Sequence, residues 1–149
     1  NVLGLHFFSP VARMPLLEIV VTSRTSPQAV ATALTYASQI DKTPIVVHDG
    51  AGFYTSRILA PYVSEALHIL EEGASIESID RAMIRFGFPV GPLALLDEVG
   101  IDVANKVAHV LQEAFGPRLQ VAPSSEKLMR DGRLGRKSGL STINLKPSH

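Results

Sequence analysis

Residues 2–8, VLGLHFF, and residues 16–21, LLEIVV, decide how the first part of this chain folds. Both are short apolar runs rich in strand-forming side chains, and a loop with two prolines separates them. They predict two β-strands. Each run carries one ionisable side chain, His6 in the first and Glu18 in the second.

These two side chains face each other if the strands form an antiparallel pair folded about Ala12, because residues whose numbers sum to 24 are then opposed. Directly opposed Cβ atoms in such a pair are about 4.5–5.5 Å apart, on one face of the sheet. A carboxylate in an apolar strand is costly to bury unless it is paired, and an imidazole is a natural partner.

The residues alone leave three interpretations of this pair open. It is a structural hydrogen bond, or two exposed residues on an edge strand, or a catalytic pair. In the catalytic interpretation Glu18 fixes the tautomer of His6 and raises its basicity, which leaves the other ring nitrogen free to take a proton from a substrate.

The rest of the chain divides at DGAGF, residues 49–53, whose small residues predict a hinge or linker. Before it, Ser26 as N-cap and Pro27 predict a helix, and TPIVVHD predicts a third strand over 43–49. Beyond it every pattern is helical. The expected helices cover 54–72 with Pro61 inside, the stretch from Ser75 to Gly87, one long helix from Pro92 to Gly116, and a short helix around 124–131.

The composition excludes several classes of function. Lysine plus arginine and aspartate plus glutamate both number 14, so no net field attracts nucleic acid or an acidic membrane surface. No apolar run reaches the length of about 18–20 residues that a membrane span needs, and no signal peptide is evident. There is no cysteine, which fits a reducing compartment without requiring one. We expect neither nucleic acid nor a membrane span.

No metal or phosphate site is predicted either. The other histidines, His48, His68, His109 and His149, show no metal-ligand spacing, and the two on helices are ordinary surface or packing positions. GAGF is neither G-x-G-x-x-G nor a P-loop, so a hinge explains it better.

Four motifs resemble the L-3-hydroxyacyl-CoA dehydrogenase family, in particular the dehydrogenase part of bacterial multifunctional fatty-acid oxidation proteins. They cover residues 1 to about 139 in the right order and spacing. They are GLHFFSPVARMPLLEIV (4–20), GFYTSRILAPYVSEALHILEEG (52–73), FGFPVGPLALLDEVGID (86–102) and GRLGRKSG (132–139).

The resemblance implies an α+β chain. Residues 1–49 would be the C-terminal strands and helix of a Rossmann-like NAD domain. Residues 50–139 would form an all-α domain like the C-terminal domain of 6-phosphogluconate dehydrogenase, and residues 140–149 a divergent or non-native tail. It also implies oxidation of a 3-hydroxyacyl-CoA by NAD in the bacterial cytoplasm, with His6 as general base and Glu18 as its partner.

Two departures from the family bear on activity. Ser56 stands where the family motif G-F-[IVY]-V-N-R has an asparagine near the substrate carbonyl, and serine is shorter and lacks the two amide donors. The family's G-x-G-x-x-G segment, its ribose-binding acid and its substrate-contacting serine are absent from this sequence. We therefore expect a piece of a longer enzyme that does not bind NAD by the family's mode, with no cofactor-binding residue assigned in it.

A second interpretation stays open, in which the chain is a non-catalytic helical module for dimerisation or partner contact with a degenerate site. Ser56 favours it, and the presence of both His6 and Glu18 favours the enzyme. The three strands would leave an open edge and an uncovered apolar face, so we expect self-association or contact with the missing NAD domain.

Overall fold

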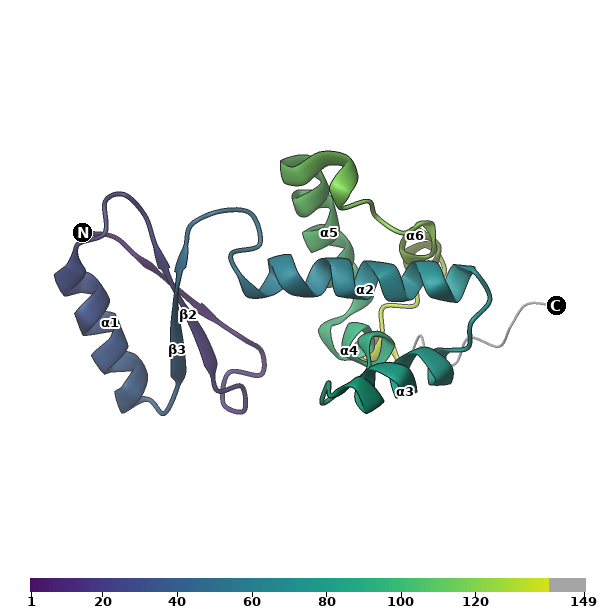
Figure 1. Cartoon of the computed structure of the whole chain (residues 1–149), viewed down its shortest axis with the longest axis horizontal. Coiled ribbons are helices and arrows are strands. Elements are labelled where there is room, and N and C mark those ends of the chain that lie inside the picture. Colours follow the sequence, from purple (N-terminus) through teal and green to yellow (C-terminus); the bar gives the residue numbers. More distant parts are fainter. Residues whose placement is uncertain (140–149) are drawn as a thin grey trace. The chain divides into compact units, whose positions relative to one another are not determined.

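The computed structural model describes residues 1–139, and the predicted tail 140–149 lies outside the described residues. The chain divides into two compact units, one up to Thr55 and one from Ser56 onward. The elements, coloured along the sequence in Figure 1, are β1 (Gly4–Phe7), β2 (Leu16–Val21), α1 (Pro27–Gln39), β3 (Thr43–His48), α2 (Thr55–Glu71), α3 (Ile76–Phe86), α4 (Pro92–Val99), α5 (Ile101–Phe115), the 3₁₀ turn η1 (Gly116–Arg118), α6 (Pro123–Arg130) and the 3₁₀ turn η2 (Arg136–Ser138).

The first unit is a three-stranded sheet in the order β1-β2-β3 with α1 against it. β1 and β2 are antiparallel, and β2 and β3 are parallel across α1. Leu17 and Ile19 of β2 are fully buried, which contributes roughly 1.5–3 kcal/mol for each side chain. The predicted register is confirmed, because His6 lies opposite Glu18.

The two outer strands of this sheet have different edges. The N–H groups of Thr43 and Asp49 donate to the carbonyls of Pro15 and Val21, at 2.7 and 2.9 Å. Because backbone nitrogens alternate in direction along a strand, those of residues 44, 46 and 48 face away from β2. Pro44 occupies one of these outward positions and has no N–H to offer. β1 contains no proline. The β3 edge is thus less suited to strand addition than the β1 edge.

Helix α1 begins as predicted. The Ser26 hydroxyl accepts from the Ala29 N–H at 3.2 Å, and Pro27 is the first helical residue. Ala33 and Ala37 are the buried side chains of the helix, and their small size lets its backbone approach the sheet closely. The close packing of the α1 backbone on the sheet and the burial of these two side chains therefore both stabilise the β2-α1-β3 crossover.

The regular elements of the second unit, within residues 56–139, are all helical, as predicted. Its core joins α2, α3, α4, α5 and α6 through Ala66, Leu67, Ile76, Ile79, Leu93, Leu96, Ile101, Ala122 and Leu128. Asp80 of α3 accepts from the Leu93 and Ala94 N–H groups at 2.9 and 3.0 Å and so caps α4. A Cβ at Gly91 would lie 2.2 Å from the Asp80 carboxyl carbon, so this cap needs glycine there.

The prediction of one long helix from Pro92 to Gly116 is wrong. Gly100 has φ +96, outside helical geometry, and separates α4 from α5. The apolar residues of this predicted helix form one stripe in the sequence, yet Val99, Val103 and Val110 within it are exposed. The change of direction at Gly100 places the two helices on different axes, so a single stripe cannot stay buried along both.

The segment GRLGRKSG, residues 132–139, packs against the junction of α4 and α5. The Leu134 carbonyl accepts from the Ile101 N–H at 3.3 Å. Arg136 pairs with Glu98, and Lys137 pairs with Asp102. Gly135 has φ +87, and a Cβ there would lie 2.6 Å from the Asp97 carbonyl oxygen. This glycine is required by both its conformation and its neighbour.

The Gly135→Ala change is therefore expected to destabilise the second unit by about 2–4 kcal/mol, since it adds a backbone clash to left-handed strain. Gly132→Ala is the matched control, because Gly132 has φ +68 but open space at its Cβ. It should cost only about 1–2 kcal/mol. Urea unfolding followed by circular dichroism measures both, and equal losses would contradict the clash.

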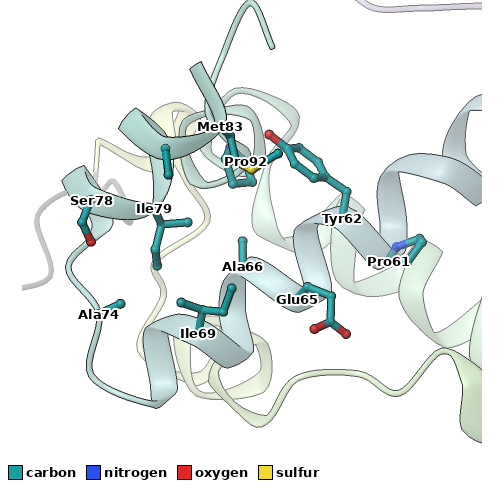
Figure 2. Close-up of a pocket in the computed structure, with 11 residues that line it drawn as sticks. Pro61, Tyr62, Glu65, Ala66, Ile69, Ala74, Ser78, Ile79, Met83 and Pro92 are labelled. Carbon is teal, nitrogen blue, oxygen red and sulfur yellow. The ribbon is translucent and has the colours of Figure 1, made fainter. Parts of the chain in front are cut away.

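A cavity of about 500 Å³ lies between α2 and α3. Figure 2 shows Ile79 of α3 on one side and Ala66 and Ile69 of α2 on the other. Tyr62 stacks on Phe88, with ring centroids 4.7 Å apart, and its hydroxyl is buried without a hydrogen-bond partner among the described residues. Burial, with the negative charge of Asp80, raises the pKa of Tyr62. The cavity is thus apolar with one unpaired hydroxyl.

Candidate functional site

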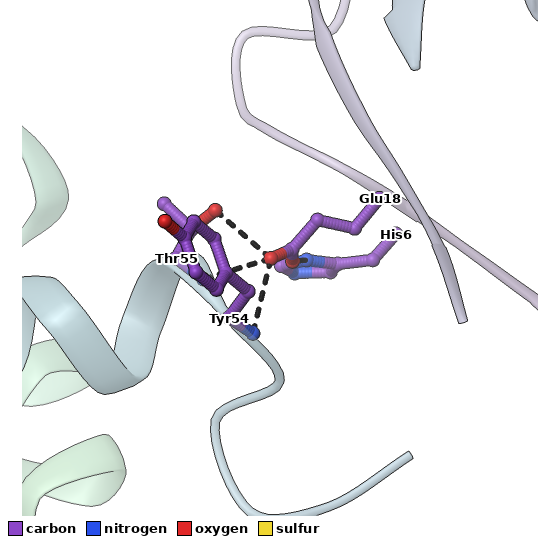
Figure 3. Close-up of polar contacts among 4 residues, drawn as sticks. All are labelled: His6, Glu18, Tyr54 and Thr55. Atoms are coloured by element: carbon purple, nitrogen blue, oxygen red, sulfur yellow. Dashed lines mark hydrogen bonds and ion pairs between the residues drawn. The ribbon is translucent and has the colours of Figure 1, made fainter. Parts of the chain in front are cut away.

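The pair predicted from strand symmetry is in contact. The Nδ1 atom of His6 lies 2.7 Å from Oε2 of Glu18, across the β1–β2 ladder (Figure 3). The Glu18 side chain is fully buried, whereas 37% of the His6 side chain is exposed. The pair therefore has a buried carboxylate end and an accessible imidazole end.

The other carboxylate oxygen of Glu18 is held by the chain that enters α2. Its Oε1 atom accepts from the Tyr54 N–H at 3.2 Å, the Thr55 N–H at 2.8 Å and the Thr55 hydroxyl at 2.9 Å (Figure 3). Residues 54 and 55, which follow the segment predicted as a hinge, thus form a cradle for a carboxylate within the first unit.

Glu18 is ionised in this setting. Burial by itself raises the pKa of the carboxyl group. The hydrogen bonds from the Thr55 N–H, His6, the Thr55 hydroxyl and the Tyr54 N–H outweigh burial and hold the pKa below its usual 4.5. A carboxylate that stays charged accepts from His6, so Nδ1 carries the hydrogen and Nε2 is left as the basic nitrogen.

Two phenyl rings flank the imidazole. The Phe8 ring is 4.8 Å from the His6 ring at 62°, and the Phe53 ring is 5.4 Å away at 55°. Phe53 has φ +45, a left-handed conformation that is rare for a bulky residue. Such strain is retained where the surroundings require it. In this conformation the Phe53 ring lies beside His6, and the N–H groups of the next two residues donate to Glu18.

The remaining predicted residues lie elsewhere. Ser56 is the second residue of α2, is half-buried and belongs to the second unit, so the site is built here from the first unit alone. His68 pairs with Glu71 at 3.4 Å on α2, and His109 is exposed on α5. Within residues 1–139 no three acidic or histidine side chains gather as a metal site, and no helix is long and apolar enough to cross a membrane.

The sequence interpretation missed Tyr54, Thr55, Phe8 and Phe53. A threonine at the start of a predicted helix is a capping signal, and this signal could have identified Thr55 as a polar residue at a helix end. No signal connected it to Glu18, 37 residues earlier, because backbone N–H donors are the same for every residue type.

Comparison with known families matches both parts of the chain. Residues 1–50 match the family described as 3-hydroxyacyl-CoA dehydrogenase, NAD binding domain. Residues 52–144 match the family described as 3-hydroxyacyl-CoA dehydrogenase, C-terminal domain. Together the two matches cover nearly the whole chain.

Curated relatives and solved structures agree with these matches. The fatty acid oxidation complex subunit alpha of Shewanella sp. (strain ANA-3) is 54% identical over 139 residues, which is 93% of this chain and 20% of that protein. The (S)-3-hydroxybutyryl-CoA dehydrogenase of Ralstonia eutropha is 39% identical, with a TM-score of 0.87 over 93% of this chain and 50% of that one. The 3-hydroxybutyryl-CoA dehydrogenase of Escherichia coli K12 is 36% identical, with a TM-score of 0.87 over 99% of this chain and 32% of that one. This chain spans about a fifth of the length of the curated relatives it matches.

Proposed function

Because the chain belongs to the 3-hydroxyacyl-CoA dehydrogenase family, we propose that it carries the proton-transfer residues of such an enzyme. His6 is the general base that takes the proton of the substrate's 3-hydroxyl group as this group becomes a ketone. Glu18 is the carboxylate that orients His6. The substrate is an acyl-CoA, in line with the names of the relatives, and the process is fatty-acid oxidation.

One observation carries this proposal: the 2.7 Å contact between a fully buried, ionised Glu18 and the accessible ring of His6. The carboxylate binds the Nδ1 hydrogen, so Nε2 is available to a substrate hydroxyl. When Nε2 takes the proton, the imidazolium is stabilised by the negative charge next to it. An accessible ring nitrogen backed by a carboxylate fits the removal of a hydroxyl proton.

The described residues do not fit NAD itself. The family match over residues 1–50 is to an NAD-binding domain, yet the strand-to-helix turn between β2 and α1 reads TSRTS and has no glycine. A pyrophosphate needs the close backbone approach that glycines permit at such a turn. The proposal therefore assigns this chain no step through NAD, and the nucleotide would be bound by residues that this sequence does not contain.

Ser56 is proposed to contact the substrate in place of the family's asparagine. Its hydroxyl donates one hydrogen bond, and serine is shorter than asparagine. A single donor to the oxygen that becomes the carbonyl gives weaker stabilisation than an amide does. We accordingly regard Ser56 as the weakest part of the site.

The domain boundary is proposed to lie near residue 50, with a NAD-domain part over 1–49 and a helical domain over 50–139. The family matches end at residue 50 and begin at residue 52, and the compact units divide after Thr55. The NAD-binding part of the enzyme is proposed to pair with the free edge of β1, since Pro44 disfavours the β3 edge.

A hybrid enzyme tests the function. The part of the Ralstonia eutropha dehydrogenase that this chain matches is replaced by the corresponding residues of this chain. The hybrid is expected to reduce acetoacetyl-CoA with NADH, followed by NADH absorbance, whereas the 149-residue chain assayed alone should show no turnover. Turnover by the chain alone would contradict the NAD assignment. A folded but inactive hybrid would contradict the function.

A second candidate function is a non-catalytic helical module for contact with a partner. The exposed Phe86 ring, stacked on Phe88, and the apolar cavity between α2 and α3 favour it. The hybrid enzyme separates the two candidates, because a contact module with a degenerate site predicts no turnover in any variant.

A further inference from the structure

Glu18 has its two oxygens committed to two different segments of the chain. Oε2 contacts His6 on β1, and Oε1 accepts from Tyr54 and Thr55 at the start of α2. A carboxylate bound on one side only can rotate about its last carbon–carbon bond. Bound on both sides, it cannot rotate without losing contacts to β1 or to the α2 start. Its orientation toward His6 therefore depends on residues 54–55.

The Thr55 hydroxyl differs from the other donors on Oε1. The Tyr54 and Thr55 N–H groups would be present with almost any side chains at these positions, whereas the third donor, at 2.9 Å, exists only because residue 55 bears a hydroxyl. In the family motif G-F-[IVY]-V-N-R this position is valine, which has the same shape as threonine and no donor. The hydroxyl can therefore be removed by a change to valine at nearly constant side-chain shape.

We propose that Thr55 is a positioning residue of the site, whose hydroxyl holds Oε1 of Glu18 so that Oε2 stays aligned with Nδ1 of His6. This rests on the proposed roles of His6 and Glu18. Thr55 does not touch the reacting atoms and acts through the carboxylate. The titratable group in contact with Glu18 is His6, from β1, and the α2 start contributes only neutral donors.

The location of Thr55 adds a reason for this arrangement. Thr55 is the first residue of α2 and directly precedes Ser56, the proposed substrate contact. A hydroxyl that binds Glu18 fixes the backbone from which Ser56 begins. A shorter donor at position 56 has less reach to absorb misplacement, so a more firmly held helix start is useful here.

The test compares Thr55→Val, which removes the hydroxyl at constant shape, with Thr55→Ser, which keeps it. Thr35→Val is the control, because Thr35 is exposed on α1 of the same unit and its hydroxyl donates within that helix, to the Ala31 carbonyl at 3.0 Å. The first readout is the titration of the Glu18 carboxyl carbon by NMR in the 149-residue chain, with the nitrogen shifts of the His6 ring to report its tautomer. The second is kcat and KM in the hybrid enzyme.

Thr55→Val is expected to move the Glu18 titration to higher pH, because an acceptor loses a donor that favours its charged form. It should also lower kcat by about fivefold with KM unchanged, the effect of one net hydrogen bond. Thr55→Ser should restore both, and Thr35→Val should change neither. Amide fingerprint spectra report folding, and Thr55→Ala replaces valine if valine disrupts the helix start.

Two results overturn the proposal. An unchanged Glu18 titration in Thr55→Val means that the hydroxyl does not hold the carboxylate. A shifted titration with unchanged kcat means that the contact is structural only. Failure of the proposed function gives a different set of results. The hybrid is then inactive, or it stays fully active after loss of His6, and the NMR result is unaffected. In that case the titration and the His6 tautomer decide whether Thr55 positions the pair.

Discussion

Replacing His6 by alanine in the hybrid enzyme is expected to lower kcat by at least about 100-fold, the lower range for loss of a general base. The reason is the arrangement at the β1–β2 ladder, where the accessible ring of His6 is backed by a buried carboxylate at 2.7 Å. KM should change little, because the lost interaction is made with the proton that is transferred in the transition state and not with the bound acyl chain.

His109→Ala is the matched control for this variant. It removes the same side chain from an exposed position on α5, where nothing in the proposal depends on it. Steady-state reduction of acetoacetyl-CoA with NADH measures both variants against the parent hybrid. A His6→Ala variant with near-parent kcat would remove His6 from the mechanism, and an equal loss in His109→Ala would point to a folding defect.

Glu18→Gln is expected to lower kcat by about 10²- to 10⁴-fold while leaving the shape of the site intact. Three donors meet at the position of Oε1, so the amide oxygen of glutamine should settle there. The amide nitrogen then faces His6 and donates to Nδ1. The ring hydrogen is forced onto Nε2, and the nitrogen that should accept the substrate proton is no longer free. NMR of the ring nitrogens would detect this tautomer directly.

The same variant has a predicted pH signature in stability. The pKa of Glu18 lies below its usual 4.5 in the folded chain, because hydrogen bonds from Thr55, His6 and Tyr54 outweigh the effect of burial. Its contribution to stability is therefore present above 4.5 and lost as the pH falls through the folded-state value. Urea unfolding should show the parent chain more stable than Glu18→Gln at about pH 7, with the difference shrinking in acid. A difference independent of pH would contradict an ionised Glu18.

The β1–β2 register was predictable because a sheet has a side-chain period of two and the loop between the strands allowed a symmetric fold. Those two facts were enough to oppose His6 and Glu18. Helix starts with a side-chain cap were predictable for the same local reason, as at Ser26 and Ser75. In each case the deciding interaction lies within a few residues or follows from strict alternation.

The break at Gly100 was not predictable from the apolar pattern. The pattern continued in step through the glycine, and α4 and α5 both bury side chains, so periodicity gave no sign of two axes. Gly100 follows an eight-residue helical pattern and is a possible C-cap signal. The apolar stripe continues past it, however, and this favoured one long helix. The exposed Val103 and Val110 show that this stripe was only partly a core.

The cradle around Glu18 was beyond sequence reasoning for a different reason. Two of its donors are backbone groups, and their convergence depends on the left-handed conformation of Phe53, which its residue type disfavours. The role of the histidine, by contrast, came from resemblance between motifs. Periodicity predicted that Glu18 lies next to His6, and the family resemblance predicted the role of His6 as a base. Neither predicted the contact of Thr55 with Glu18.

The unequal edges of the small sheet limit how copies of this chain can assemble. Two β1 edges that meet would pair antiparallel about a two-fold axis, and such a contact closes on itself. Continued growth would need the opposite edge, where Pro44 presents no donor toward an incoming strand. Association through the sheet should thus favour closed pairs over filaments, because Pro44 weakens strand addition at the opposite edge.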